Sequence, residues 1–351
     1  MKPKKGSIIF SLFLIQILGL VTIWSTTPEL FFTQLSFFVA GVIIILLLSQ
    51  VDIDLLFGSS WILYIGSILL LLLTAVIGKN IRGSVRWIDL GFFNLQASEI
   101  IKATLAIFYS QYLSKNSLRS LKSFFIFLAL AIVPVALVAR QPDLGSALTL
   151  LSLPIALLAV TGHFKRLVVV GLVSMAILLP IESKILKPYQ RQRIESFINP
   201  YQDPQGAGYN VIQATIAIGS GGLWGKGVRL GTQSHLNYLP ERHTDFIFAS
   251  FAEEFGLFGI TVLFFTYFFL LSSILRISSL LRQKSHALLS LSFFFIFLFQ
   301  ILVNVGMNLG VMPVTGITLP IFSYGGSSLL SFAIMIGLMF RLLDLITPFE
   351  I

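Results

Sequence analysis

The segment 240–256, which reads PERHTDFIFASFAEEFG, contains three acidic side chains beyond Glu241: Asp245, Glu253 and Glu254. Carboxylates at membrane depth are costly, so they usually carry a function or a structural pairing. On one continuous helix, Glu253 lies roughly 12 Å deeper than Asp245 at about 1.5 Å per residue. At about 100° per residue, Glu253 is turned roughly 80° and Glu254 roughly 180° from Asp245. We therefore predict that Asp245, at the accessible end, is the catalytic residue, and that Glu253 and Glu254 hold helices together or line a cavity floor.

A second pair of charges lies in the stretch ASEIIKATL, where Glu99 and Lys102 are three residues apart. On a helix this spacing places both side chains on one face. A buried pair costs much less than an unpaired charge in a membrane. Two readings stay open, because the pair either fixes helix packing as a salt bridge or lines a cavity and also binds substrate.

The composition makes these charges unusual. Of the 351 residues, 56% are hydrophobic and only 11% are charged, whereas soluble domains carry about 25% charged residues. Apolar runs close to the ~20 residues that cross a bilayer recur along the chain. We therefore predict an all-α, polytopic integral membrane protein with one membrane domain over 1–351 and about ten transmembrane helices. The expected spans are 7–24, 34–49, 60–78, 97–114, 122–139, 144–162, 165–181, 245–275, 286–306 and 325–343.

The distribution of basic residues predicts the orientation. Placing the N-terminus in the cytoplasm puts most short-loop Lys and Arg residues inside, as membrane insertion favours, so both termini are expected to be cytoplasmic. The long segment 182–244 between the seventh and eighth spans is then extracytoplasmic. The net charge of +9 suggests contact with anionic membrane lipids and no nucleic acid partner. The chain has no cysteine, and its scattered histidines lack metal-ligand spacing, so no protein-built metal site is predicted.

Several basic residues remain on the outer side, where topology gives no reason for them. We interpret them as ligands of an anionic substrate; the alternative is pairing with lipid phosphates and nearby acids. Near Arg140, Pro142 breaks the helix and Asp143 is placed to cap the next one, so Arg140 either binds substrate or pairs with Asp143. The candidate substrate-binding basic residues are Arg86, Arg140, Lys226 and Arg242.

Two outer segments are rich in glycine. In the segment 182–244, residues 209–219 fit a short amphipathic helix, and the following glycines, 219–231, would let backbone amides approach a ligand. The last outer loop is uncharged and irregular, which a membrane tolerates only in a cavity wall or a buried site. Its polar lining candidates include Asn304, Asn308, Ser323 and Tyr324, and packing of small residues between helices is the alternative.

Five blocks in this order resemble the SEDS proteins (shape, elongation, division and sporulation). The blocks are RWIDLGFFNLQASEIIK, RQPDLGSALTL, NPYQDPQGAGYNVIQATIAIGSGG, GTQSHLNYLPERHTDFIFASFAEEFG and MPVTGITLPIFSYGGSS. The sequence PERHTDFIF followed by AEEFG is more similar to the RodA branch than to the FtsW branch. In this resemblance Asp245 matches the essential aspartate of the family, Glu99 and Lys102 match a pair in the fourth span, and Arg86 matches the basic residue before the tryptophan.

The resemblance implies a peptidoglycan glycosyltransferase that polymerises lipid II at the outer face of the bacterial cytoplasmic membrane, for cell elongation and shape. A class B penicillin-binding protein is the implied partner. Asp245 would act as general base in an inverting displacement, with undecaprenyl pyrophosphate as leaving group. Basic side chains or a divalent cation, Mg²⁺ or Mn²⁺, would stabilise the developing charge. No organic cofactor is expected.

Two other functions remain compatible with the sequence. Many spans and buried charges are also typical of transporters, so a flippase of a lipid-linked precursor is one alternative. Against it, the two halves lack matching interrupted helices, and the irregular polar segments gather on the outer side. A scaffold that only recruits a penicillin-binding protein is the other alternative, and it leaves Asp245 unexplained.

Overall fold

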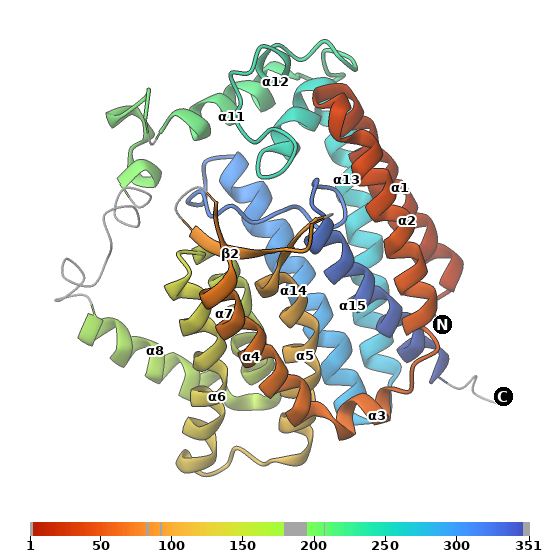
Figure 1. The fold of residues 1–351 in the computed structure, drawn as a ribbon, viewed down its shortest axis with the longest axis vertical. Coiled ribbons are helices and arrows are strands. Elements are labelled where there is room, and N and C mark those ends of the chain that lie inside the picture. Colours follow the sequence, from red (N-terminus) through yellow and green to blue (C-terminus); the bar gives the residue numbers. More distant parts are fainter. Residues whose placement is uncertain (1–2, 82–83, 92, 179–194, 207, 347–351) are drawn as a thin grey trace.

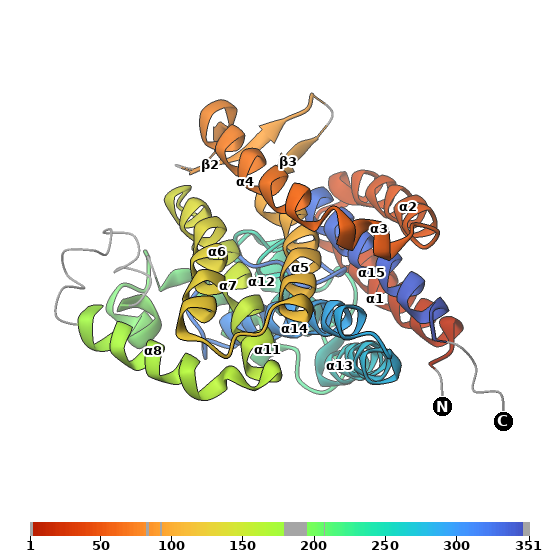
Figure 2. The ribbon, with the colours of Figure 1, turned by 90° about the horizontal axis from the view of Figure 1, so that it is seen from below.

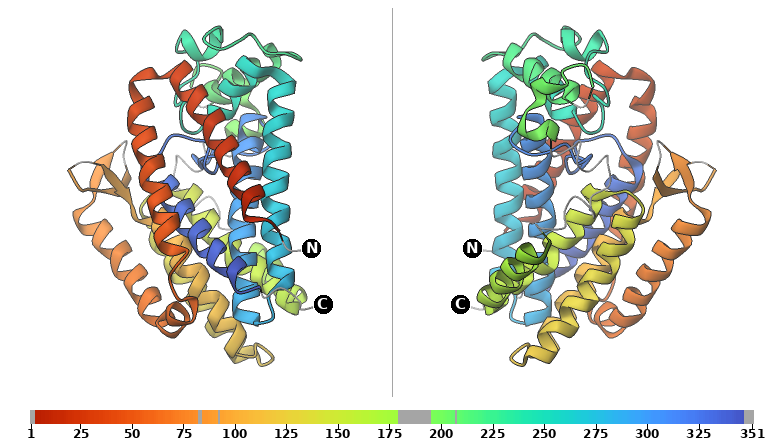
Figure 3. Two further views of the ribbon diagram at one scale, coloured as in Figure 1. Left: turned by 90° about the vertical axis from the view of Figure 1, so that its right-hand side faces the viewer. Right: turned by 90° about the vertical axis from the view of Figure 1, so that its left-hand side faces the viewer.

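A computed structural model describes residues 3–81, 84–91, 93–178, 195–206 and 208–346. Figure 1 shows a bundle of long helices, with the short helices α11 (Tyr209–Ser220) and α12 (Thr232–His235) across one end. The helix predicted over 209–219 is therefore confirmed as α11. The start of α1 (Lys5–Thr26) and the end of α15 (Gly326–Asp344) lie away from that layer, as Figure 3 also shows, and Lys5 pairs with Asp344 at 2.7 Å. The residues 182–194 of the long predicted loop lie outside the described residues.

Each of the ten predicted spans corresponds to a long helix. Eight helical segments are long and apolar enough to cross a membrane; α7 and α8 count as one of them, and α5 is not included. Most residues of α5 are buried among other helices, and Figure 2 shows α5 near the middle of the bundle, so it can be more polar than a lipid-facing helix. The long helices are α1 (Lys5–Thr26), α2 (Phe31–Leu48), α4 (Ser60–Ile77), α5 (Ala97–Lys115), α6 (Leu121–Arg140), α7 (Leu144–Leu158), α8 (Phe164–Leu178), α13 (Ile247–Leu280), α14 (Lys284–Asn308) and α15 (Gly326–Asp344).

Several short helices connect the long ones. They are η1 (Pro28–Leu30), α3 (Ile53–Gly58), the π-turn η2 (Ala159–His163) and η4 (Pro200–Gln202). The turn η2 contains Gly162 at a φ of 86°, a left-handed conformation that suits glycine. This conformation changes the chain direction between the end of α7 and the start of α8.

The segment between α4 and α5 differs from the all-helical prediction. It forms a small antiparallel sheet in the order β1 (Lys79–Ile81), β2 (Ser84–Asp89) and β3 (Asn94–Gln96). Trp87 pairs with Gln96, and Ile88 pairs with Leu95. Alternation along β2 places Arg86 and the buried Ile88 on the same face, toward the bundle. The strands are short, so their alternation was too brief to identify before the structure.

A break divides α13 at Gly256, whose φ of 62° and ψ of −163° are not helical. The loop 221–231 fills this break, since Leu257 N–H donates to the Gly222 carbonyl at 2.9 Å and Phe258 N–H to Leu223 at 3.0 Å. A Cβ on Gly225 would lie 2.1 Å from the carbonyl oxygen of Glu254. Gly225 therefore allows the loop to approach the backbone of α13 closely, and the approach of a ligand to this glycine-rich segment stays a prediction.

Candidate active site around Asp245

Asp245 lies half-buried in the turn that leads into α13, at the end of the bundle that carries α11 and α12. Two asparagines of α14 hold its backbone, because the Nδ2 amides of Asn304 and Asn308 donate to the Asp245 carbonyl at 3.1 and 3.0 Å. Asn308 also accepts from the N–H of Ala249 at 3.2 Å. These contacts fix the start of α13, and with it the aspartate, on the end of α14.

The loop between α14 and α15 forms a wall beside the Asp245 carboxylate. A Cβ on Gly316 would lie 3.4 Å from Oδ2 of Asp245, and the φ of +73° at Gly316 itself favours glycine. Asn304 donates to the Ile317 carbonyl at 2.7 Å. The same asparagine therefore positions both the aspartate and the loop that faces it.

Ser323 and Tyr324 fasten that loop to the turn before α13. The Ser323 hydroxyl donates to the Thr244 carbonyl and accepts from the Leu319 N–H, at 2.9 and 2.8 Å. The Tyr324 N–H donates to the His243 carbonyl at 2.9 Å, and the two rings meet edge to face. Burial raises the pKa of Tyr324, so its hydroxyl stays protonated at neutral pH. Both residues are bonded to the turn that precedes Asp245, and their contact with substrate stays a prediction.

Glu99 and Lys102 form a buried ion pair at 2.6 Å on α5. Glu99 is 7% exposed and Lys102 is 2% exposed. The hydroxyl of Ser331 on α15 donates to the Glu99 carbonyl at 2.7 Å, and the Lys102 ammonium lies 5.3 Å from the centre of the Phe332 ring. The pair therefore joins α5 to α15, as the packing interpretation expected, and substrate contact stays a prediction.

Arg86 and Arg140 have different surroundings at the start of α7. Arg86 pairs with the buried Asp143 at 3.5 Å, and Asp143 caps α7 by accepting from the Ser146 N–H at 3.1 Å. Gln96 of β3 also donates to Asp143 at 2.9 Å. The capping role is confirmed, but the arginine paired with Asp143 is Arg86. Arg140 is exposed at the end of α6.

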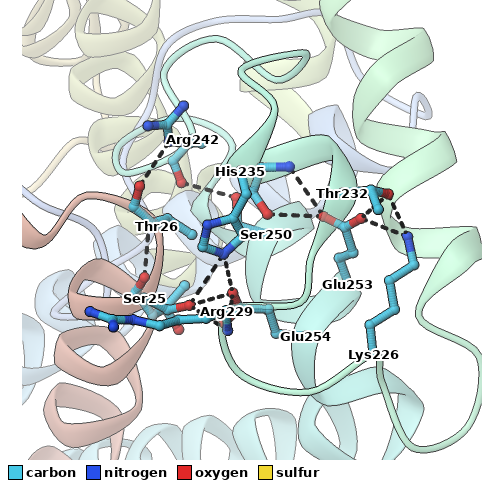
Figure 4. Close-up of polar contacts among 12 residues, drawn as sticks. Ser25, Thr26, Lys226, Arg229, Thr232, His235, Arg242, Ser250, Glu253 and Glu254 are labelled. Atoms are coloured by element: carbon cyan, nitrogen blue, oxygen red, sulfur yellow. Dashed lines mark hydrogen bonds and ion pairs between the residues drawn. The ribbon is translucent and has the colours of Figure 1, made fainter.

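Lys226 is held by the buried Glu253 at 2.8 Å and by Thr232 at 2.8 Å (Figure 4). Glu253 also accepts from the N–H groups of Gln233 and Ser234, at 2.9 and 3.2 Å. The charged partner of Glu253 is thus Lys226, from the loop before α12. Lys226 joins the loop 221–231 to α13, and substrate binding by Lys226 stays a prediction.

Glu254 ties the same loop to α1. It accepts hydrogen bonds from the Ser25 hydroxyl and from the Arg229 N–H, the latter at 3.2 Å, and its Oε1 lies 3.0 Å from Nε2 of His235 (Figure 4). Arg242 reaches α1 as well, because its Nε donates to the Thr26 carbonyl at 3.1 Å. Arg242 also donates to the side chain of Asn237. Glu253 and Glu254 therefore hold structural elements together, and substrate binding by Arg242 stays a prediction.

The described part of the chain contains no group of three or more His, Asp or Glu side chains suited to a metal ion. Mg²⁺ is commonly held by one or two carboxylates together with substrate phosphates. Within the described ranges, a divalent cation would therefore be held by fewer than three such side chains together with oxygens from a substrate.

Comparisons with known proteins agree with this architecture. The family model for FtsW, RodA and SpoVE, described as cell cycle proteins, matches residues 6–345. The peptidoglycan glycosyltransferase MrdB of Escherichia coli strain K12 is 40% identical over 292 residues, which cover 83% of this chain and 79% of MrdB. The probable peptidoglycan glycosyltransferase FtsW of Tolumonas auensis is 37% identical over 290 residues, covering 80% of this chain and 74% of that protein.

Two solved structures share the fold. A chain of a peptidoglycan synthase complex, described for its structural coordination of polymerization and crosslinking, superposes with a TM-score of 0.84 at 34% identity. The rod shape determining protein RodA of Thermus thermophilus superposes with a TM-score of 0.74 at 29% identity. Each alignment covers 97% of this chain and 97% of the other. This multi-pass membrane protein therefore belongs to the FtsW, RodA and SpoVE family, the SEDS family that includes these peptidoglycan glycosyltransferases.

Proposed function

We propose that this protein polymerises lipid II into β-1,4-linked glycan strands at the outer face of the bacterial cytoplasmic membrane. The observation that carries the proposal is the setting of Asp245. It is a half-buried carboxylate at one end of the bundle, on a turn fixed by Asn304 and Asn308. Gly316, in the loop between α14 and α15, lies beside it. A rigidly held carboxylate within reach of a headgroup is what a general base requires.

In the proposed reaction Asp245 takes the proton from the hydroxyl of the acceptor sugar, once the two oxygens are about 2.6–3.2 Å apart. The hydroxyl oxygen forms a bond to the anomeric carbon of the donor sugar. The bond from that carbon to the pyrophosphate oxygen breaks, and its electron pair leaves with undecaprenyl pyrophosphate. One direct displacement inverts the configuration, from an α-linked donor to a β-linked product. The leaving group is already anionic, so no second carboxyl is needed to protonate it.

Basic side chains would stabilise the negative charge of the leaving pyrophosphate. Arg140 is the most accessible candidate because it is exposed, and Arg86 is partly exposed while paired with Asp143. Lys226 and Arg242 are bound to protein groups, so they would have to exchange partners to reach a substrate. A divalent cation bound with the pyrophosphate would supply further positive charge there, and polymerisation with and without EDTA tests that requirement.

The partner and the cellular role follow by analogy. Because a related chain belongs to a synthase complex of polymerization and crosslinking, we propose that this protein acts with a class B penicillin-binding protein. Its likeness to MrdB and to a rod shape determining protein supports a role in elongation and shape. Because Lys5 pairs with Asp344, the start of α1 and the end of α15 lie on the same side of the bundle. We propose that this side is cytoplasmic.

The test is polymerisation of lipid II by the purified protein with its partner, comparing wild type with Asp245→Asn. The expected result is loss of glycan product with unchanged thermal unfolding and unchanged partner binding. Full activity of the variant would overturn the role of Asp245. Proteoliposomes with headgroup-labelled lipid separate transport from synthesis, since movement of lipid without polymer would support a flippase instead.

A further inference from the structure

An open groove runs between α7 and α14 at the depth of the membrane. Its volume is about 360 Å³, within the range of about 300–1,000 Å³ that is usual for small-molecule sites. Its lining is almost entirely apolar and includes Leu148, Ile155 and Ala156 of α7 and Phe295, Phe299 and Leu302 of α14. Leu148 and Ile155 are 42% and 40% exposed, so the groove opens toward lipid. The helix α8 does not cover it, because the chain bends away from α7 at Gly162 (Figure 1).

One end of the groove lies at about the same depth as the Asp245 site along both helices. On α14, Leu302 lies two residues before Asn304, which holds the Asp245 carbonyl. On α7, Leu148 lies three residues after Gly145, where a Cβ would be 2.5 Å from the Thr315 carbonyl oxygen. At about 1.5 Å per residue, both positions are within about one helical turn of the walls of the Asp245 site. An apolar chain lying in the groove would therefore end at about the depth of Asp245 along α14.

The charges at this end suit an anionic group attached to an apolar chain. Arg86 lies against Asp143, the cap of α7, and Arg140 ends α6 three residues before that cap. Arg86 is balanced by Asp143, whereas Arg140 is exposed and adds a net positive charge. Arginine binds phosphate groups through charge-assisted hydrogen bonds. Apolar lining followed by arginine therefore matches the order of tail and pyrophosphate in a polyprenyl pyrophosphate.

We propose that the groove between α7 and α14 binds the polyprenyl tail of the lipid-linked substrate. The pyrophosphate then lies toward Arg140 and Arg86, and the sugar lies at Asp245. This inference rests on the proposed polymerase function and assigns the part of the site that takes the tail. An ordinary membrane lipid would also fit the groove, but it lacks the second contact at Asp245. Joining the tail to a bound headgroup raises the effective concentration of the tail at the groove, which favours the substrate.

Photo-crosslinking tests occupancy directly. Ile155→p-benzoylphenylalanine places a photoreactive group in the groove, and Ala129→p-benzoylphenylalanine places one on the exposed, lipid-facing side of α6. The probe is radiolabelled polyprenyl pyrophosphate with the purified protein in detergent micelles. Labelling at Ile155 should exceed labelling at Ala129, and unlabelled polyprenyl pyrophosphate should compete with it while phosphatidylglycerol should not. Equal labelling at both positions, or equal competition by phosphatidylglycerol, would overturn the proposal.

Kinetics provide an independent test. Ala156→Trp fills the groove, and Ala129→Trp adds the same side chain where no groove exists. The groove variant should raise the KM for long-tailed lipid II about tenfold, equivalent to about 1.4 kcal/mol of binding, with little change for a short-tailed analogue. The Ala129 variant should keep the wild-type preference for the long tail. Thermal unfolding in the same micelles shows whether each variant is folded.

The outcomes separate this proposal from the function on which it rests. If the wild type makes polymer and the Ala156→Trp variant keeps its tail-length preference, the groove assignment fails and the polymerase function stands. If the wild type makes no polymer under conditions where its partner is bound, the polymerase function fails. In that case crosslinking still reports whether the groove selects a prenyl pyrophosphate over a phospholipid.

Discussion

The side-chain amide of Asn308 donates a hydrogen bond to the backbone carbonyl of Asp245 at 3.0 Å. Asn304, one turn earlier on α14, donates to the same carbonyl at 3.1 Å. Both asparagines are fully buried, so neither bond competes with water, and buried polar groups of this kind are costly to leave unpaired. The end of α14 thus determines where the carboxylate of Asp245 stands relative to the loop that contains Gly316.

Asn308→Leu should therefore lower kcat for lipid II polymerisation while leaving KM nearly unchanged. A displacement of about 1 Å in a catalytic group costs about 100-fold in rate. Asn308 is not expected to contact the substrate, so ground-state binding should persist. Steady-state kinetics with purified protein and partner give both constants. A rise in KM at constant kcat would show that Asn308 contributes to binding and not to placement.

A matched control for this variant lies on the same helix. Gln300 is 1% exposed and its Oε1 has no hydrogen-bond partner among the described residues. Gln300→Leu removes a buried amide from α14 without touching Asp245, and it should leave kcat within about twofold of wild type. Loss of an unpaired buried polar group is close to neutral or stabilising. If both leucine variants lose kcat equally, α14 acts through its packing as a whole.

The ion pair of Glu99 and Lys102 should be much more sensitive to single substitutions than to a double one. Lys102→Met leaves Glu99 buried without a partner and should lower the free energy of unfolding by about 3–5 kcal/mol. Adding Glu99→Gln removes the unpaired charge and should recover most of that loss. Unfolding in detergent micelles, followed for both variants, measures the difference.

The double variant also separates the two interpretations of this pair. If the pair serves packing alone, the double variant should be stable and active with a KM close to that of wild type. If the pair also binds substrate, stability should return while the KM for lipid II stays raised. Single and double variants that are equally unstable would contradict the ion-pair explanation itself.

Hydropathy predicted the long helices well because lipid-facing surface must be apolar over the whole length of a span. It also located α5, whose polar residues are tolerated because that helix lies inside the bundle. The sheet from Lys79 to Gln96 was missed because β1 and β3 have only three residues each. Too few positions alternate there for a strand pattern to be distinguished from a polar loop.

The sequence predicted which acidic residues lie at the candidate site, but it did not predict which residues they contact. Depth along the chain separated Asp245 from Glu253 and Glu254; in the structure Asp245 lies in the turn before α13, and both glutamates lie on α13 before its break at Gly256. The hydrogen-bond partners of Glu254 could not be predicted, since Ser25 and Glu254 are 229 positions apart in sequence. No local spacing rule connects residues at such separation, and a hydrogen bond between them depends on how whole helices pack.

Ser25→Ala should loosen the contact between α1 and the loop 221–231. Ser25 donates to the buried Glu254 and accepts from the Arg229 N–H at 2.9 Å. Losing both hydrogen bonds should cost about 1–3 kcal/mol of the free energy of unfolding. Hydrogen exchange of the 226–235 amides, measured by mass spectrometry, should become faster. Ser7→Ala on the exposed start of α1 is the control and should change stability by no more than about 0.5 kcal/mol. Unchanged exchange in 226–235 would mean that Glu254 is held adequately by other donors.

Two glycines of the segment 209–231 should respond to alanine in opposite ways. A Cβ on Gly225 would lie 2.1 Å from the Glu254 carbonyl oxygen, and its φ of +81° disfavours alanine in any case. Gly225→Ala should therefore separate the loop from the break in α13 and lower the melting temperature. Gly219 is exposed near the end of α11 and a Cβ there meets nothing within 4 Å, so Gly219→Ala should stabilise the helix by up to about 1 kcal/mol. Thermal unfolding of the two variants under identical conditions measures both melting temperatures. Equal changes in melting temperature would show that the stability of the loop does not depend on its close approach to α13.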